Sequence, residues 1–205
     1  MDARLRGHDA WRGSMTRPFS FTTENLAKAK AIIAKYPIGR QASAVVPLLD
    51  IAQRQNNNWL SPAAMDCVAD MLDMPAIRVY EVASFYTMFN LQPIGRNFVQ
   101  ICTTTPCWLR GSDGIVKTCR DKLGIGPGET SADGKFTVTE VECLAACVNA
   151  PMVQINDDFY EDLTPEIMGK VLDELAAGRK PPVGSQTGRR GSAPQSGPTS
   201  LKEKA

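Results

Sequence analysis

Two pairs of cysteines constrain this chain more than any other feature of its sequence. Cys102 and Cys107 have four residues between them, and Cys143 and Cys147 have three. Each pair directly follows a segment whose residues predict a strand, so strand ends would deliver both pairs to one edge of a sheet. Two thiolate pairs for two irons is the arrangement that an all-cysteine 2Fe–2S cluster requires. We therefore predict a metal site at these four residues and no catalytic residue on the chain.

Other kinds of cysteine site fit the spacing less well. Structural zinc also takes four thiolates, usually from pairs two residues apart, so a zinc-bound scaffold for assembly stays open on spacing alone. A dithiol redox centre would need two residues between its cysteines at the start of a helix, and no such motif is present. The two remaining cysteines, Cys67 and Cys119, fall on the inward stripes of predicted helices. There cysteine behaves as a small apolar residue, so we interpret both as core residues.

Small residues lie between the cysteines of each pair. Three threonines, residues 103–105, precede Cys107, and Ala145 and Ala146 precede Cys147. Short side chains let backbone N–H groups approach the sulfurs, where they would offset the negative charge of a thiolate cluster. The loops are therefore suited in composition to a cluster.

Charge and hydropathy exclude several classes of partner. The chain has 205 residues, and its 23 basic and 22 acidic residues leave a net charge of +1. That balance does not indicate a nucleic-acid partner. No apolar run approaches the roughly 20 residues of a spanning helix, so we expect no direct membrane insertion. Six cysteines without a secretion signal favour a reducing compartment, where cysteines bind metal or stay buried more often than they pair.

The two ends of the chain differ in composition from its middle. Residues 1–18 are rich in arginine and hold the only histidine, His8, but Asp2 and Asp9 argue against a mitochondrial transit peptide. We interpret them as a leader that is disordered or a misannotated start. Residues 178–205 have almost no large apolar side chains, so burial cannot offset the entropy of ordering them. We predict a flexible tail there.

Between the ends, the period of the apolar residues changes once. Residues 19–92 repeat apolar side chains at three- and four-residue steps, which predicts a small bundle of four short helices. Residues 93–177 predict an α/β domain, with strands at 98–101 and 137–142, a hairpin turning at 156–158, and helices at 111–123 and from Thr164. The chain as a whole is therefore predicted to be α+β.

A glycine-rich stretch, residues 124–128, does not predict a nucleotide site. Its glycines have the wrong spacing, and they follow a predicted helix where a phosphate-binding loop would follow a strand. We interpret the stretch as a turn. The sequence thus shows no site for NADH or flavin.

The motifs taken together resemble one known family. Glu81–Phe89, the Cys102–Cys107 segment, the 35 residues between the pairs and Val141–Pro151 are similar to the 24-kDa 2Fe–2S subunits of respiratory complex I, the NADH:quinone oxidoreductase. The likeness covers residues 19–177. The sequence departs from the family pattern between Cys143 and Cys147, where Ala145 stands at a position at which the family commonly has glycine.

The resemblance implies a thioredoxin-like ferredoxin domain after the helical bundle, with cluster ligands at the four cysteines. It implies a one-electron carrier, not catalytic alone, that binds the flavin- and NADH-binding subunit and other subunits of the peripheral arm. FMN and NADH would belong to the partner only. The complex would lie at the cytoplasmic side of a bacterial inner membrane, or at the matrix side in a eukaryote. Related ferredoxin subunits serve NAD-linked hydrogenases and formate dehydrogenases, and the sequence separates these alternatives poorly.

Overall fold

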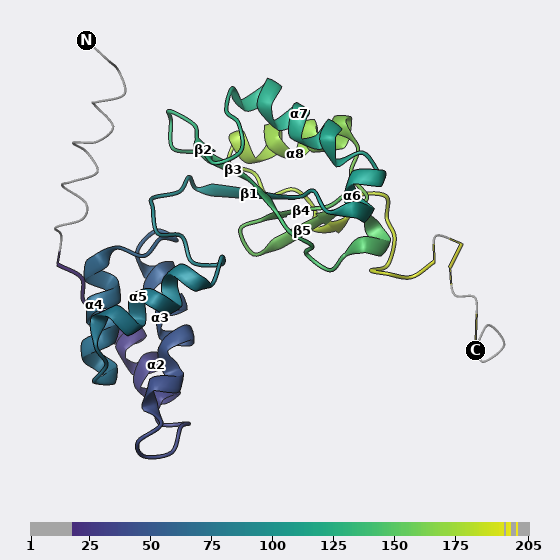
Figure 1. Ribbon diagram of the computed structural model, residues 1–205. Coiled ribbons are helices and arrows are strands. Elements are labelled where there is room, and N and C mark those ends of the chain that lie inside the picture. The colour runs from purple at the N-terminus through teal and green to yellow at the C-terminus, as the bar shows by residue number, and fades with distance from the viewer. Residues whose placement is uncertain (1–17, 195, 198–199, 201–205) are drawn as a thin grey trace, which may run out of the picture. The chain divides into compact units, whose positions relative to one another are not determined.

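The computed structural model describes residues 18–194, 196–197 and 200, and the chain divides into two compact units, Met1–Ile94 and Gly95–Ala205 (Figure 1). The division falls two residues after the change of period in the sequence. Apart from its last residue, the predicted leader lies outside the described residues.

The first unit is helical. Its elements are α2 (Thr23–Ile33), η1 (Gln41–Ala44), α3 (Val45–Gln55), α4 (Pro62–Leu72) and α5 (Ala76–Phe85). Polar caps set where two of these helices begin. The Thr22 hydroxyl accepts from the Asn25 amide at 3.3 Å, and the Ser61 hydroxyl accepts from the Ala64 amide at 3.2 Å. Apolar residues of the helices, together with Leu60 from the connection between α3 and α4, form one core, which includes Leu48, Leu49, Val68 and Val79.

The second unit is built on a six-stranded sheet with the order β2-β3-β1-β4-β5-β6. The strands are β1 (Asn97–Cys102), β2 (Glu129–Thr130), β3 (Phe136–Val141), β4 (Val153–Ile155), β5 (Asp158–Glu161) and β6 (Gly184–Ser185). The central pair, β1 and β3, is parallel, and β5 and β6 are parallel, whereas the remaining neighbours are antiparallel. The α+β class predicted from the sequence is thus the one observed.

Two longer helices cover one face of this sheet (Figure 1). Parallel strands need a crossover connection, and α7 (Ser112–Leu123) supplies it between β1 and β3. Beside it lies α8 (Pro165–Ala176). Their inward side chains and those of the strands form the second core, which includes Val99, Ile101, Ile115, Met168 and Leu172. Two short helical turns, α6 (Thr105–Leu109) and η2 (Cys147–Asn149), lie in the segments that the sequence pattern had predicted as loops.

The segment after α8 is ordered beyond the predicted domain end. Gly184 and Ser185 form β6 beside Tyr160 and Glu161 of β5. The prediction of a flexible tail is therefore wrong for residues 184–194. Composition measures only the apolar surface a segment can bury, whereas this segment is held by main-chain hydrogen bonds to a sheet edge and by polar side chains.

The cap of α8 gives a testable stability effect. The Thr164 hydroxyl accepts from the Ile167 amide at 3.2 Å, and Thr164 is exposed, so its removal creates no cavity. We expect Thr164→Ala to lower the free energy of unfolding by about 1 kcal/mol in a urea titration. Thr164→Ser keeps the hydroxyl and is expected to stay within a few tenths of a kcal/mol of the parent. Equal losses in both variants would show that the cap does not stabilise α8.

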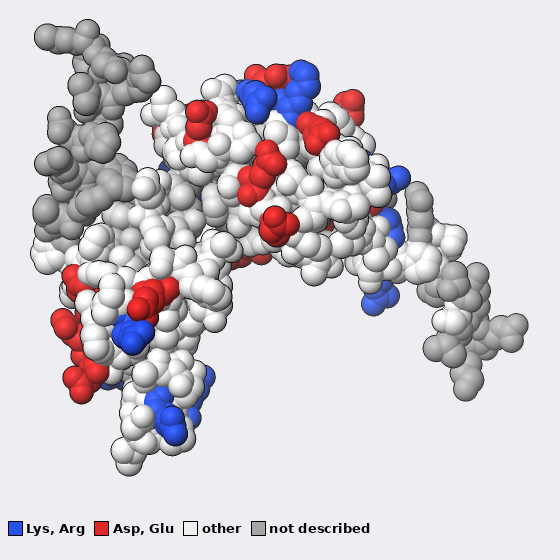
Figure 2. Space-filling model, in the orientation of Figure 1, with Lys and Arg blue, Asp and Glu red and all other residues white. Residues whose placement is uncertain are grey.

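On the side of the molecule that Figure 2 shows, acidic and basic side chains are interspersed on both units, and neither charge forms a large patch. That mixture agrees with the net charge of +1. Within the described part of the chain, the helices are all too short or too polar to span a membrane.

Candidate metal centre

The parallel strands β1 and β3 bring the two cysteine pairs to one edge of the sheet. Cys102 is the last residue of β1, and the strand register sets it opposite Val141, the last residue of β3. The chain leaves each strand there, so the segments that carry Cys107, Cys143 and Cys147 start side by side. A parallel register places both carboxyl ends on the same side of the sheet, so two segments whose cysteine pairs are 35 residues apart in sequence begin next to each other.

The first pair is buried. Cys102 and Cys107 are each 1 % exposed and pack with Ala150 and Met152 in a small apolar cluster. Cys107 does not lie in a plain loop, because the chain turns into α6 two residues before it. The helical turn brings the Cys107 thiol back to the sulfur of Cys102, with which it hydrogen-bonds.

Hydrogen bonds decide which of these two thiols ionises first. Burial acts to raise the pKa of Cys102, but hydrogen bonds from the Thr104 hydroxyl and from the Thr104 and Leu144 amides outweigh it, so this pKa lies below its ordinary value. The hydroxyl of Thr104 is 3.3 Å from the Cys102 sulfur. Burial raises the pKa of Cys107 to about 12, and the hydrogen bond to Cys102 adds to this. The hydrogen bonds from Thr104 and Leu144 therefore stabilise negative charge on the Cys102 sulfur.

The second pair is exposed. The sulfurs of Cys143 and Cys147 lie 3.4 Å apart, and the Ala145 amide donates to the Cys143 sulfur at 3.4 Å. The contact with Cys143 raises the pKa of Cys147 above its ordinary value. Ala145 has a φ of 64°, in the left-handed region, which costs an L-residue roughly 1 kcal/mol relative to glycine. This conformation explains why glycine suits the position at which the chain departs from the family pattern.

The donor set suits a group with two metal atoms. The four sulfurs occur as two pairs, with hydrogen bonds between Cys102 and Cys107 and between Cys143 and Cys147. The two pairs also interact electrostatically, because the charge of Cys102 contributes to the raised pKa of Cys147. Thiolates in pairs, amide and hydroxyl donors to sulfur, and an apolar floor are what a 2Fe–2S cluster needs.

An open hollow of about 290 Å³ is lined by residues of both cysteine segments. Its walls are residues 103–105 and Trp108 from the first cysteine segment and Glu142 from the second. Residues of both segments therefore border one surface.

The two cysteines that were predicted to fill cores differ from each other. Cys119 on α7 is fully buried, and burial raises its pKa to about 12, so it is a core residue as predicted. Cys67 on α4 is only half-buried. The buried face of α4 is formed by Ala64, Met65, Val68, Ala69 and Leu72, which leaves Cys67 at its margin. The glycine stretch at 124–128 forms the connection from α7 to β2, with Gly124 and Gly128 at positive φ.

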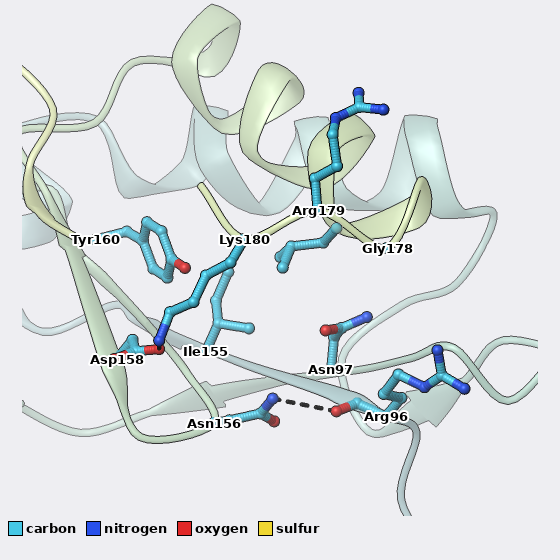
Figure 3. A pocket seen from close by; sticks show the side chains of 10 residues that line it. Arg96, Asn97, Ile155, Asn156, Asp158, Tyr160, Gly178, Arg179 and Lys180 are labelled. Atoms are coloured by element: carbon cyan, nitrogen blue, oxygen red, sulfur yellow. Dashed lines mark hydrogen bonds and ion pairs between the residues drawn. The ribbon is translucent and has the colours of Figure 1, made fainter. Parts of the chain in front are cut away.

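A second cavity, also of about 290 Å³, lies at the opposite end of β1 (Figure 3). Its cationic lining is largely neutralised. Lys180 is paired with Asp158 at 2.8 Å, and the guanidinium of Arg179 points away from the cavity toward Glu174. Two of the three basic side chains that line the cavity are therefore paired with carboxylates.

Comparison with known proteins connects this geometry to a family. A family model described as thioredoxin-like [2Fe-2S] ferredoxin matches residues 29–176. The chain belongs to this family. The 2Fe–2S cluster predicted from the cysteine pairs is the cofactor for which the family is named, and the thioredoxin-like fold is confirmed.

Several members of this ferredoxin family are close in sequence to the chain. An NADH-quinone oxidoreductase subunit of Rickettsia bellii is 62 % identical over 157 residues, which cover 77 % of this chain and 94 % of the relative. The mitochondrial NADH dehydrogenase [ubiquinone] flavoprotein 2 of Dictyostelium discoideum is 56 % identical over 186 residues, covering 91 % and 75 %. These names agree with the resemblance to complex I subunits.

A solved structure shares the fold at lower identity. A chain of an NAD+-reducing [NiFe]-hydrogenase in its air-oxidised state superposes with a TM-score of 0.57 and 21 % identity, covering 63 % of this chain and 23 % of that chain. At this identity the likeness concerns the fold alone.

Sequence reasoning missed some of the polar groups around the centre. It treated residues 103–105 as small spacers, whereas the Thr104 hydroxyl contacts a sulfur directly. It gave no role to Asn149, although this residue is buried two positions after Cys147. An asparagine so close to a cysteine is a weak signal in the sequence, because its partners lie in other segments.

Proposed function

We propose that the chain is the one-electron carrier subunit of an NADH:quinone oxidoreductase, with Cys102, Cys107, Cys143 and Cys147 as the ligands of its cluster. The observation that supports the proposal is that both cysteine segments leave the sheet at the carboxyl ends of β1 and β3, where Cys102 lies opposite Val141. The cluster supplies reversible one-electron chemistry when it is bound.

Different residues at the carboxyl ends of β1 and β3 would have different roles in holding the cluster. Cys102 and Cys107 would hold one iron against the apolar floor, where water is excluded. Cys143 and Cys147 would hold the other iron at the surface, where a redox partner can approach. The Thr104 hydroxyl and the Ala145 amide would donate to ligand sulfurs and so stabilise their negative charge.

A partner subunit would supply FMN and NADH. Relatives that are 56–62 % identical are named as an NADH-quinone oxidoreductase subunit and an NADH dehydrogenase [ubiquinone] flavoprotein, which supports this assembly over an NAD-linked hydrogenase or a formate dehydrogenase. The exposed apolar side chains of Trp108, Leu109 and Val148 lie in α6 and η2, the turns that also hold Cys107 and Cys147. Their cover by the flavin-binding subunit would bring the FMN close to the exposed cysteine pair. As a peripheral subunit, the chain would lie at the cytoplasmic face of a bacterial membrane or the matrix face of a mitochondrial one.

The division of labour is testable by NADH oxidation. We expect the purified chain to show no NADH–ferricyanide activity, because the FMN and the NADH site belong to its partner. Dithionite should reduce the chain and give a spin-one-half EPR signal. NADH should give the same signal only after the flavin-binding subunit is added. NADH oxidation by the chain alone would contradict the proposal, and so would a complex in which dithionite but not NADH reduces this cluster.

A further inference from the structure

The segment that was predicted to be a flexible tail contacts the turn that carries Cys147. We call residues 184–193 the strap. It begins as β6 beside β5, and the Gln186 amide donates to the Glu161 carbonyl at 3.0 Å. From this anchor the strap continues to the second cysteine segment.

Arg189 joins the strap to that segment. Its guanidinium is paired with Asp162 at 3.1 Å and donates to the Val148 carbonyl at 3.2 Å and to the Ala193 carbonyl at 3.1 Å. The Arg189 and Asp162 side chains are only 17 % and 12 % exposed. The Ser185 hydroxyl donates to the second oxygen of Asp162 at 2.6 Å, which holds the carboxylate in place from the strap itself.

Asn149 makes a second connection between the strap and the cysteine turn. It is 3 % exposed, and its side-chain amide donates to the Gly191 carbonyl at 2.8 Å and to the Glu161 carboxylate. The Asp162 amide donates to the Asn149 carbonyl at 2.7 Å. Both residues that follow Cys147 in η2, Val148 and Asn149, are therefore bonded to the strap.

These contacts hold the two residues that follow Cys147 in the chain. Cys147 is itself exposed and shares η2 only with Val148 and Asn149. We propose that the strap holds the Cys147 thiolate in the position at which it binds iron, with Arg189 as the positioning residue. The inference rests on the proposed ligand set. A planar guanidinium suits the role because it bridges a carboxylate and two carbonyls at once, which a lysine ammonium cannot reproduce with the same geometry.

The test uses the full-length chain loaded with its cluster. We expect Arg189→Gln to accelerate cluster loss to an iron chelator by about 10-fold, the lower end of what the removal of an outer partner costs a metal site. The visible circular dichroism of the bound cluster should also change, because one ligand sulfur is less well fixed. Arg189→Lys should recover part of the lifetime and of the spectrum. Arg190→Gln is the matched control, because it removes the same charge from an exposed neighbour.

A second variant covers the case in which Arg189→Gln folds poorly. A chain ending at Val183 lacks the strap but keeps α8 and the strands β1 to β5. We expect it to lose the cluster at least as fast as Arg189→Gln. Lifetimes and spectra equal to those of the parent in both variants would overturn the proposal, as would an equal effect of Arg190→Gln. Failure of the proposed function would appear differently: NADH would not reduce the cluster even with the flavin-binding subunit added, while the cluster lifetime of the chain would still depend on Arg189.

Discussion

Cys143→Ala is expected to remove the 2Fe–2S cluster from this chain, whereas Cys119→Ala should leave it in place. Alanine offers no donor atom, and Cys143 stands with Cys147 at 3.4 Å, so its loss leaves one iron with a single protein thiolate. Cys119 is fully buried on α7 among apolar side chains and contributes only packing. Its replacement should cost about 1 kcal/mol of folding free energy without affecting the metal.

The measurement is iron and acid-labile sulfide per chain, together with the EPR signal after dithionite reduction. Cys102→Ala, Cys107→Ala and Cys147→Ala should behave as Cys143→Ala does. A colourless parent protein that contains zinc would contradict the cluster itself. Equal iron contents in Cys143→Ala and Cys119→Ala would instead show that the ligand set is wrong.

Gly95→Ala should destabilise the second unit by about 2–3 kcal/mol, because there is no room for a side chain. A Cβ at this position would lie 2.6–2.9 Å from backbone atoms of Phe136, the first residue of β3. Backbone atoms cannot rotate away, so the start of β3 would have to move. The Gly95 amide also donates to the Thr137 hydroxyl at 2.6 Å, and that hydrogen bond would be disturbed too. The change therefore weakens the strand pair that brings the cysteines together.

Hydrogen exchange at the amides of β1 measures this effect in the second unit alone. Gly126→Ala is the matched control, because a Cβ there would meet its nearest atom, an oxygen of Glu129, at an ordinary 3.6 Å. Its cost should stay within about 0.5 kcal/mol. If Gly95→Ala exchanged no faster than Gly126→Ala, the close contact with Phe136 would not constrain the fold.

The helix starts and the strand positions were predictable because they depend on local patterns. The start of α8 at Thr164 and the turn between β4 and β5 lie where the sequence indicates them. Each depends on residues within three or four positions of one another. Elements that depend on distant partners were missed. β6 needs the edge of β5, which lies more than twenty residues earlier in the chain.

The candidate metal centre also combines features that local sequence predicts with features that depend on distant residues. The sequence alone determined which four cysteines stand in pairs after strands, and their spacing left zinc as an alternative. Only the tertiary structure showed one pair buried and the other exposed, and only it placed the Thr104 hydroxyl against a sulfur. Burial and hydrogen bonding depend on the strands and turns that pack around a residue, and no local pattern encodes them.

The sequence by itself thus determined the α+β class, the cysteine pairs and their suitability for a two-iron site. The tertiary structure decided how the second pair is held, because Arg189 meets Asp162 from 27 residues away and Asn149 meets Gly191 from 42. Composition predicts order only where apolar surface can be buried. The strap is ordered by polar contacts to segments that are distant in sequence, and such contacts exist only once the sheet has formed.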